Sequence, residues 1–117
     1  MPIIDLISRK KFEDYLVELI DLVNLFPKAQ KFLLAEKILK SAFLVMDDVI
    51  EIQYTKKEDR GKIFCNFRLH LEKLKQYQRI AWRKNFINHK TMINQEKKID
   101  EVGRLVSSLC RCSSSSE

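Results

Sequence analysis

Hydrophobic residues recur at helical spacing along most of this chain. Between residues 12 and 26 they step by three or four, which is typical of a helix that buries one stripe. The stripe consists of Phe12, Tyr15, Leu16, Leu19, Val23 and Phe26. Ser8 is expected to cap the start of this helix with its hydroxyl. We expect the helix to end at Phe26–Pro27, because the residue before a proline avoids helical torsions.

A second helical pattern begins just past Pro27 and has a wide apolar arc. Its stripe contains Phe32, Ala35, Leu39, Ala42, Met46, Val49 and Ile50, and it is widened by Leu34, Ile38 and Val45. The arc covers roughly half of the circumference, whereas a surface helix needs only about 100°. This width predicts contact with two neighbours or with another subunit. Leu33 and Leu44 fall on the polar side with Asp48, which indicates an oligomer surface.

The third helix is the longest predicted. Thr55 and Glu58 have the spacing of a capping box, so the helix is expected to begin there and to run to Lys84. Its inner residues are Ile63, Phe64, Phe67, Leu71, Leu74, Ala81 and Trp82. A short polar link, residues 85–90, follows it, and Phe86 and Ile87 are expected to fold back onto the bundle.

Thr91 is expected to cap the fourth helix, whose inner residues are Met92, Ile99, Val102, Val106 and Leu109. Gly103 lies beside this stripe, where glycine costs about 1 kcal/mol relative to alanine. A close approach of another helix would explain that glycine.

Four amphipathic helices joined by short links predict an all-α, antiparallel up-down-up-down four-helix bundle. No alternating β-branched run competes with this fold, and the chain has only 2 Gly and 2 Pro. We expect a single domain over residues 1–112 and a disordered Ser-rich tail over residues 113–117. The longest apolar run, Ala42 to Met46, is far shorter than the ~20 residues that span a bilayer. Met1 to Asp5 has no charged leader, so the expected location is the cytoplasm.

Charge is distributed unevenly between the two halves of the chain. Residues 1–55 hold 7 basic and 9 acidic groups, a net charge of −2, whereas residues 56–117 hold 15 basic and 7 acidic groups, a net charge of +8. Most of the excess lies on the third helix. At 100° per residue, every basic residue from 62 to 84 faces away from the core, and only Glu72 interrupts them. Gln78 and Tyr77 are expected on the same outer face.

Solvated helices usually alternate charges of opposite sign, because such pairs stabilise the helix. Like charges neighbour one another here, which predicts a surface for a polyanion such as nucleic acid; a merely solvated face is the alternative. From a helical-wheel projection at 100° per residue, we assign phosphate contacts to Arg68, Lys75, Arg79 and Arg83, with Lys73, Lys84 and Arg104 as outer contributors. Leu69 and Ile80 lie among the cations and, like Leu44, are either incidentally exposed or contact another subunit or partner.

No motif for catalysis, a metal or a cofactor is recognisable. The chain has neither a phosphate-binding glycine loop nor a nucleophile elbow. His70 is expected to be a packed histidine, and the adjacent carboxylates Asp47 and Asp48 point about 100° apart on a helix. Cys65, Cys110 and Cys112 do not combine with the histidines at a zinc spacing. We therefore expect a protein that is not an enzyme.

The order of features resembles a known family. Phe26-Pro27-Lys28 precedes FLLAEKIL at residues 32–39, then comes LEKLKQYQRIAWR at residues 71–83, and IDEVGRLVSSL follows at residues 99–109. This arrangement resembles the accessory variability determinant (Avd) proteins of diversity-generating retroelements. Their relatives are the four-helix-bundle proteins encoded in 23S ribosomal RNA intervening sequences. A Trp that the family often carries after the Gly-containing signature is absent here.

The resemblance implies a homopentameric, positively charged barrel. It also implies that the protein binds the reverse transcriptase of the element and its template-repeat RNA, and possibly DNA. Such a subunit has no active site and supports priming and mutagenic cDNA synthesis. The alternative is a bundle of the ribosomal intervening-sequence type with a structural or protein-adaptor role.

Overall fold

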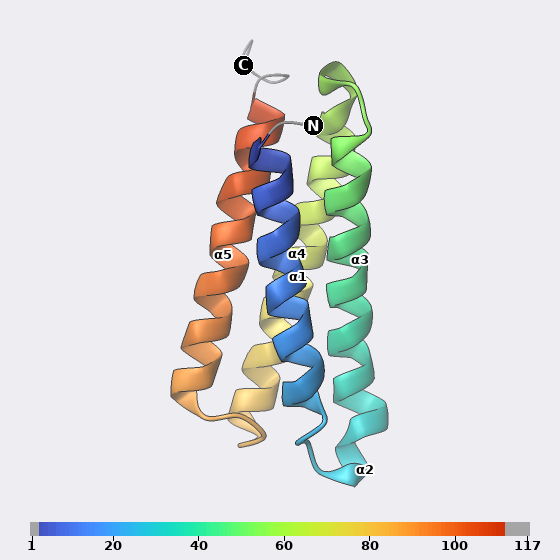
Figure 1. Cartoon of the computed structure of the whole chain (residues 1–117). Helices are drawn as coiled ribbons and strands as arrows, with labels where there is room; N and C mark the ends of the chain where they lie inside the picture. The colour runs from blue at the N-terminus through green and yellow to red at the C-terminus, as the bar shows by residue number, and fades with distance from the viewer. Residues whose placement is uncertain (1–2, 112–117) are drawn as a thin grey trace.

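The computed structural model describes residues 3–111, and the side chains of all of these except 3–5, 30, 31 and 111. Within this range the chain is helical and has no strand, which confirms the predicted class. Four long helices run antiparallel in chain order, each packs against the next, and the last closes the bundle against the first (Figure 1). They are α1 (Ile3–Val23), α3 (Glu36–Gln53), α4 (Arg60–Arg83) and α5 (His89–Arg111).

The predicted stripes of all four helices meet in one core. Its fully buried members include Phe12, Tyr15 and Leu19 from α1, Ile38, Val45 and Val49 from α3, Phe67 and Leu74 from α4, and Ile99 and Val106 from α5. Ile50 was assigned to the inner stripe of the second helix wrongly, because it lies at the edge of the predicted arc and is 37% exposed. Phe32 was also assigned to the core wrongly, because it is 85% exposed. It lies in η1 (Lys31–Ala35), a π-helical turn that joins α2 (Lys28–Gln30) to α3. A π turn contains an extra residue, so the 3.6-residue phase of α3 does not extend back to Phe32.

Three predicted caps are wrong. Ser8 is buried inside α1, which extends back to Ile3. The hydroxyl of Thr55 donates to the Glu51 carbonyl, 2.7 Å away, and thus belongs to the end of α3. A short 3₁₀ turn, η2 (Lys57–Asp59), leads into α4, which has no side-chain cap. At the start of α5, Asn88 provides the cap in place of Thr91, because its Oδ1 accepts the Thr91 N–H at 2.8 Å.

The turn after α4 is a Schellman motif that the backbone of Asn85 makes possible. Asn85 is left-handed, with φ of 65°, a conformation that asparagine tolerates better than most residues. The Phe86 N–H donates to the Ala81 carbonyl and the Asn85 N–H to the Trp82 carbonyl, both at 2.9 Å. Phe86 then packs against Phe26, with 5.4 Å between the ring centroids, and Ile87 is buried. The predicted return of both side chains onto the bundle is confirmed.

Buried polar groups lock the helices to one another. Arg60 donates from Nε to the Thr55 carbonyl at 2.9 Å and from Nη1 to the Leu109 carbonyl at 3.0 Å. Gln78 was predicted on the outer face, but it is buried and donates to the Tyr15 hydroxyl at 2.8 Å. A wheel drawn for one helix assigns polar residues to solvent, and it cannot reveal that a neighbouring helix supplies a partner.

Asp48 is a second buried polar residue that was predicted on an exposed side. Its Oδ2 lies 2.5 Å from the Nδ1 of His70, so α3 and α4 share this hydrogen bond. Burial raises the pKa of Asp48, and the hydrogen bond from His70 opposes that rise without cancelling it. His70 is therefore a packed histidine, as predicted, and Asp47 is exposed beside the buried Asp48.

Candidate nucleic-acid interface

The basic residues of α4 that were predicted to face solvent form one surface, here called the α4 cationic face. Its members are Arg68, Lys73, Lys75, Arg79, Arg83 and Lys84. All are exposed except Lys75, which is half-buried. Leu69 and Ile80 lie among them with 53% and 40% of their surface exposed, and Leu44 on α3 is 37% exposed. The predicted outward orientation of these side chains is thus confirmed, while the ligand they contact stays a prediction.

Two cations of the α4 cationic face are paired with acids of α5. The Arg79 Nε donates to Glu96 Oε2 at 2.8 Å, and the Arg79 Nη2 donates to Glu96 Oε1 at 3.3 Å. The Lys75 Nζ lies 3.0 Å from Asp100 Oδ1. Burial lowers the pKa of Lys75, but Asp100 and Glu72 outweigh it and raise that pKa above its ordinary value. The charge crowding inferred from the sequence is therefore relieved in part by α5.

The remaining cations have no acidic partner within the described part of the chain. Arg68, Lys73, Arg83 and Lys84 make no ion pair there, and neither does Arg104 on α5. Arg68 instead holds its guanidinium 6.0 Å from the centroid of the Phe64 ring, which is cation–π distance. Arg68, Lys73, Arg83 and Lys84 therefore carry uncompensated positive charge, whereas the charge of Arg104 interacts with the Glu101 carboxylate and helps to lower its pKa.

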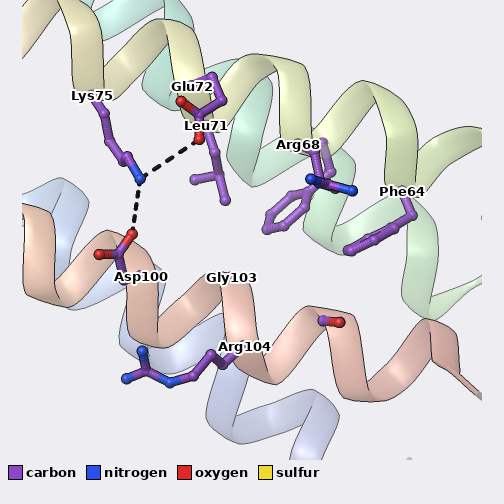
Figure 2. A pocket seen from close by; sticks show the side chains of 10 residues that line it. Phe64, Arg68, Leu71, Glu72, Lys75, Asp100, Gly103 and Arg104 are labelled. Atoms are coloured by element: carbon purple, nitrogen blue, oxygen red, sulfur yellow. Dashed lines mark hydrogen bonds and ion pairs between the residues drawn. The ribbon is translucent and has the colours of Figure 1, made fainter.

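A groove lies between α4 and α5 beside the cationic face (Figure 2). It encloses about 420 Å³ and is open to solvent. The lining residues are Phe64, Phe67, Arg68, Leu71, Glu72 and Lys75 from α4, and Asp100, Gly103, Arg104 and Ser107 from α5. In Figure 2 the side chains of Phe64 and Leu71 point from α4 toward α5, and the Lys75–Asp100 ion pair bridges the two helices at one end.

The sequence alone did not reveal this groove. The one signal was Gly103, whose missing side chain leaves the floor open opposite Leu71. A Cβ at this position would lie 3.4 Å from the Cδ1 of Leu71, which is ordinary van der Waals contact. Packing against α4 therefore does not require glycine, contrary to the prediction that a close approach of another helix explains it. Periodicity could not indicate the groove itself, because its walls are residues that a wheel divides between core and surface.

The described side chains form no group of three or more His, Cys, Asp or Glu that could hold a metal ion. Cys65 is exposed on α4 and Cys110 is buried near the end of α5, while Cys112 and the Ser-rich tail lie outside the described residues. Burial raises the pKa of the Cys110 thiol, which keeps it protonated. The Nδ1 of His70 is already hydrogen-bonded to Asp48, and the pair lies between α3 and α4.

The family model described as bAvd-like matches residues 6–113, which span all four helices of the bundle. The chain belongs to the bAvd-like family. The resemblance to Avd proteins read from the sequence is thereby confirmed, and with it the membership of a family of accessory proteins. Among curated proteins and among solved structures, none matches the chain. No described helix combines the length and the apolar character needed to cross a membrane.

Proposed function

We propose that this protein is a non-enzymatic accessory subunit of a diversity-generating retroelement reverse transcriptase and binds the template-repeat RNA through the α4 cationic face. Membership of the bAvd-like family supports the association with the polymerase. The observation that carries the RNA-binding part is a set of five cations that make no ion pair within the described residues, Arg68, Lys73, Arg83, Lys84 and Arg104. Uncompensated Lys and Arg side chains attract phosphates and release the counterions that surround them.

The two kinds of cation on this face would act differently. Arg68, Arg83 and Lys84 meet phosphates directly, because nothing within the described residues competes for them. Lys75 and Arg79 hold α5 at a fixed distance from α4 and can share a phosphate only by loosening an ion pair. Exposed ion pairs contribute only about 0–1 kcal/mol, so a phosphate can displace the acid. At 24 residues, α4 extends about 36 Å and can follow several phosphates along one strand.

We also infer that the protein assembles as a homo-oligomer, a pentamer by resemblance to its family. Large apolar side chains are exposed on three helices, which supports contact between subunits. Besides Leu44, Leu69 and Ile80, they include Val17 and Ile20 on α1 and Phe43 and Ile50 on α3. Several copies in one assembly would add their cationic faces and raise the affinity for a long polyanion. Light scattering at two protein concentrations measures the mass of this assembly.

Charge reversal of unpaired cations tests the RNA-binding proposal. In the triple variant Arg68→Glu, Arg83→Glu, Lys84→Glu, we expect RNA affinity to fall at least 100-fold. The slope of log affinity against log salt should drop by about 0.7 for each lost phosphate contact to a single strand. Circular dichroism should show unchanged helix content, because all three side chains are exposed.

The matched control is Lys28→Glu, Lys37→Glu, Lys40→Glu, which changes the net charge equally on the opposite half of the chain. RNA binding by the control should remain within a few-fold of the unchanged protein. Equal losses in the two triple variants would show that only net charge matters and would refute the assignment to α4. If the unchanged protein bound no RNA, the exposed Leu69 and Ile80 would favour the alternative role as a protein adaptor.

A further inference from the structure

We propose that the groove between α4 and α5 receives one unpaired base of a single-stranded nucleic acid, which stacks on the Phe64 ring. This inference rests on the proposed RNA binding and adds that the protein distinguishes single strands from duplexes. It begins from the chemistry of the groove, which combines a flat aromatic wall, an apolar floor and a positive rim (Figure 2).

The aromatic wall is built by two rings of α4. Phe64 and Phe67 lie nearly parallel, with 22° between their planes and 5.9 Å between their centroids. Phe67 is fully buried and holds the pair against the core, while Phe64 is only partly buried and lines the groove. A partly exposed ring fixed by a buried neighbour is a stable stacking platform, because it loses little freedom when a base covers it. Bases of single strands commonly stack on such rings.

The rim supplies charge for the phosphates on either side of that base. Arg68 lies over the Phe64 ring, with its guanidinium 6.0 Å from the ring centroid and without an ion pair in the described chain, so a stacking base would share the ring with Arg68 or displace it. Arg104 lies at the opposite rim, on α5, where its side chain extends along the helix and leaves the groove open (Figure 2). Guanidinium groups serve both as phosphate ligands and as stacking partners for bases.

The floor explains why position 103 is a glycine. A Cβ there would lie 3.4 Å from the Cδ1 of Leu71, which is the near edge of ordinary van der Waals contact with a flexible side chain. Helix packing therefore tolerates alanine at this position, although alanine would favour the helix. The glycine instead keeps the floor recessed, and the resulting volume of about 420 Å³ lies within the range of small-ligand pockets, about 300–1,000 Å³.

The shape of the groove favours an unpaired base over other occupants. A base within a duplex is stacked on both faces, so it cannot reach a ring recessed between two helices. Single-stranded RNA can turn a base outward. An acidic peptide would match the rim but would leave the aromatic wall unused. The Glu72 and Asp100 carboxylates lie beside Lys75 at one end of the groove, where they would repel a phosphate.

A pair of oligonucleotides with equal charge tests the proposal on the full-length protein. One is a short single-stranded RNA with 2-aminopurine at its centre, and the other has an abasic ribose at that position. We expect 2-aminopurine fluorescence to be quenched on binding and the abasic strand to bind roughly 5- to 150-fold more weakly, the range for one stacked base. An RNA duplex of the same length should bind without a base-dependent component.

Two variants assign the effect to the groove. Phe64→Leu keeps an apolar side chain but removes the ring, and Gly103→Ala raises the floor without a packing clash. In both variants the 2-aminopurine strand should bind about as weakly as the abasic strand, and the quenching of its fluorescence should disappear. The control Trp82→Leu alters an aromatic residue outside the groove, which contacts His89, and should retain the difference between the two strands.

The outcomes separate this inference from the proposed function. If the 2-aminopurine and abasic strands bound equally, with no quenching of fluorescence, the base-binding groove would be refuted while RNA binding through charge would stand. If neither strand nor the duplex bound, both proposals would fail together. Should a variant fail to fold, the comparison of the two strands on the unchanged protein still decides whether a base is inserted.

Discussion

A buried hydrogen bond in the middle of the bundle makes a quantitative prediction about stability. Gln78 on α4 donates to the Tyr15 hydroxyl of α1 at 2.8 Å, and both residues are 1% exposed. The side-chain carbonyl of Gln78, Oε1, has no hydrogen-bond partner among the described residues. The interaction therefore satisfies one polar group of Gln78 and leaves another buried without a partner. Each group left in this condition costs about 1–3 kcal/mol.

The two single substitutions should differ from each other. Tyr15→Phe leaves both polar atoms of the Gln78 amide unpaired, so it should destabilise the protein by about 1–3 kcal/mol. Gln78→Met removes the unpaired side-chain carbonyl but leaves the Tyr15 hydroxyl without its hydrogen-bond donor. The stabilising and destabilising effects nearly cancel. The double variant removes every polar atom of the pair at similar volume. It should be more stable than the unchanged protein by about 1 kcal/mol or more.

Urea unfolding of the four proteins measures this cycle. All four should be compared at one protein concentration, because assembly contributes to apparent stability. The slope with denaturant should be the same in each, so midpoints report stability directly. The coupling energy should be about 2–4 kcal/mol in the direction that makes the double variant more stable than additivity predicts. Additive single effects would show that the two side chains do not share a buried bond, and would refute the reasoning.

Two other buried polar contacts yield predictions. His70→Leu should destabilise by about 1–3 kcal/mol at pH 7, because it leaves the Asp48 carboxylate buried without its partner. Burial raises the Asp48 pKa above its unfolded value and His70 opposes that rise. The destabilisation caused by His70→Leu should therefore shrink as the pH falls below the pKa of Asp48 in the folded protein, because the carboxyl group then becomes neutral. Urea titrations at pH 4 and pH 7 would show this difference. Arg60→Met should cost about 2–3 kcal/mol, since the carbonyls of Thr55 and Leu109 lose a charged donor, and hydrogen exchange should accelerate in the last turns of α5.

Periodicity was sufficient to predict the bundle because burial repeats with the helix. Each long helix buries most of the stripe that the spacing predicted, with Ile50 on α3 as an exception, and Ile99 and Val106 on α5 are as deeply buried as Phe12 on α1. The prediction failed at Phe32, where a π turn shifts the phase by part of a turn. Local hydrogen bonding decides such a shift, and the spacing of apolar residues does not record it.

Caps were harder to predict than cores for a physical reason. Ser, Thr and Asn can all satisfy a backbone N–H, and this chain offers several near each helix start. Asn88 and Thr91 are three residues apart, and either could begin α5 on local grounds. The position of Ile87 in the core fixes where the chain turns, and this places Asn88 at the cap. Tertiary packing thus chose between two candidates that the local sequence leaves nearly equal.

The candidate site could be predicted only in part, because a helical wheel describes one helix whereas the site is formed by two. A wheel drawn for α4 correctly placed Arg68 and Arg83 in solvent, because that depends on α4 alone. It could not show that Glu96 and Asp100 of α5 neutralise two of the predicted phosphate ligands, since this requires the angle between two helices. Charge patterning along one segment therefore overestimates the positive charge available to a ligand.

The ion pairs between α4 and α5 also explain why charge and shape can coexist on one surface. A row of cations without acids would repel itself and favour separation of the helices that carry it. Lys75 and Arg79 instead pair with Asp100 and Glu96 of α5, and the Lys75–Asp100 pair lies at one end of the groove. Arg68 and Arg83, which lack such partners within residues 3–111, keep their charge for a ligand. The paired cations therefore join the two helices of the interface and the unpaired cations attract the ligand, so neutralising Glu96 or Asp100 should free a cation and add positive charge to this surface.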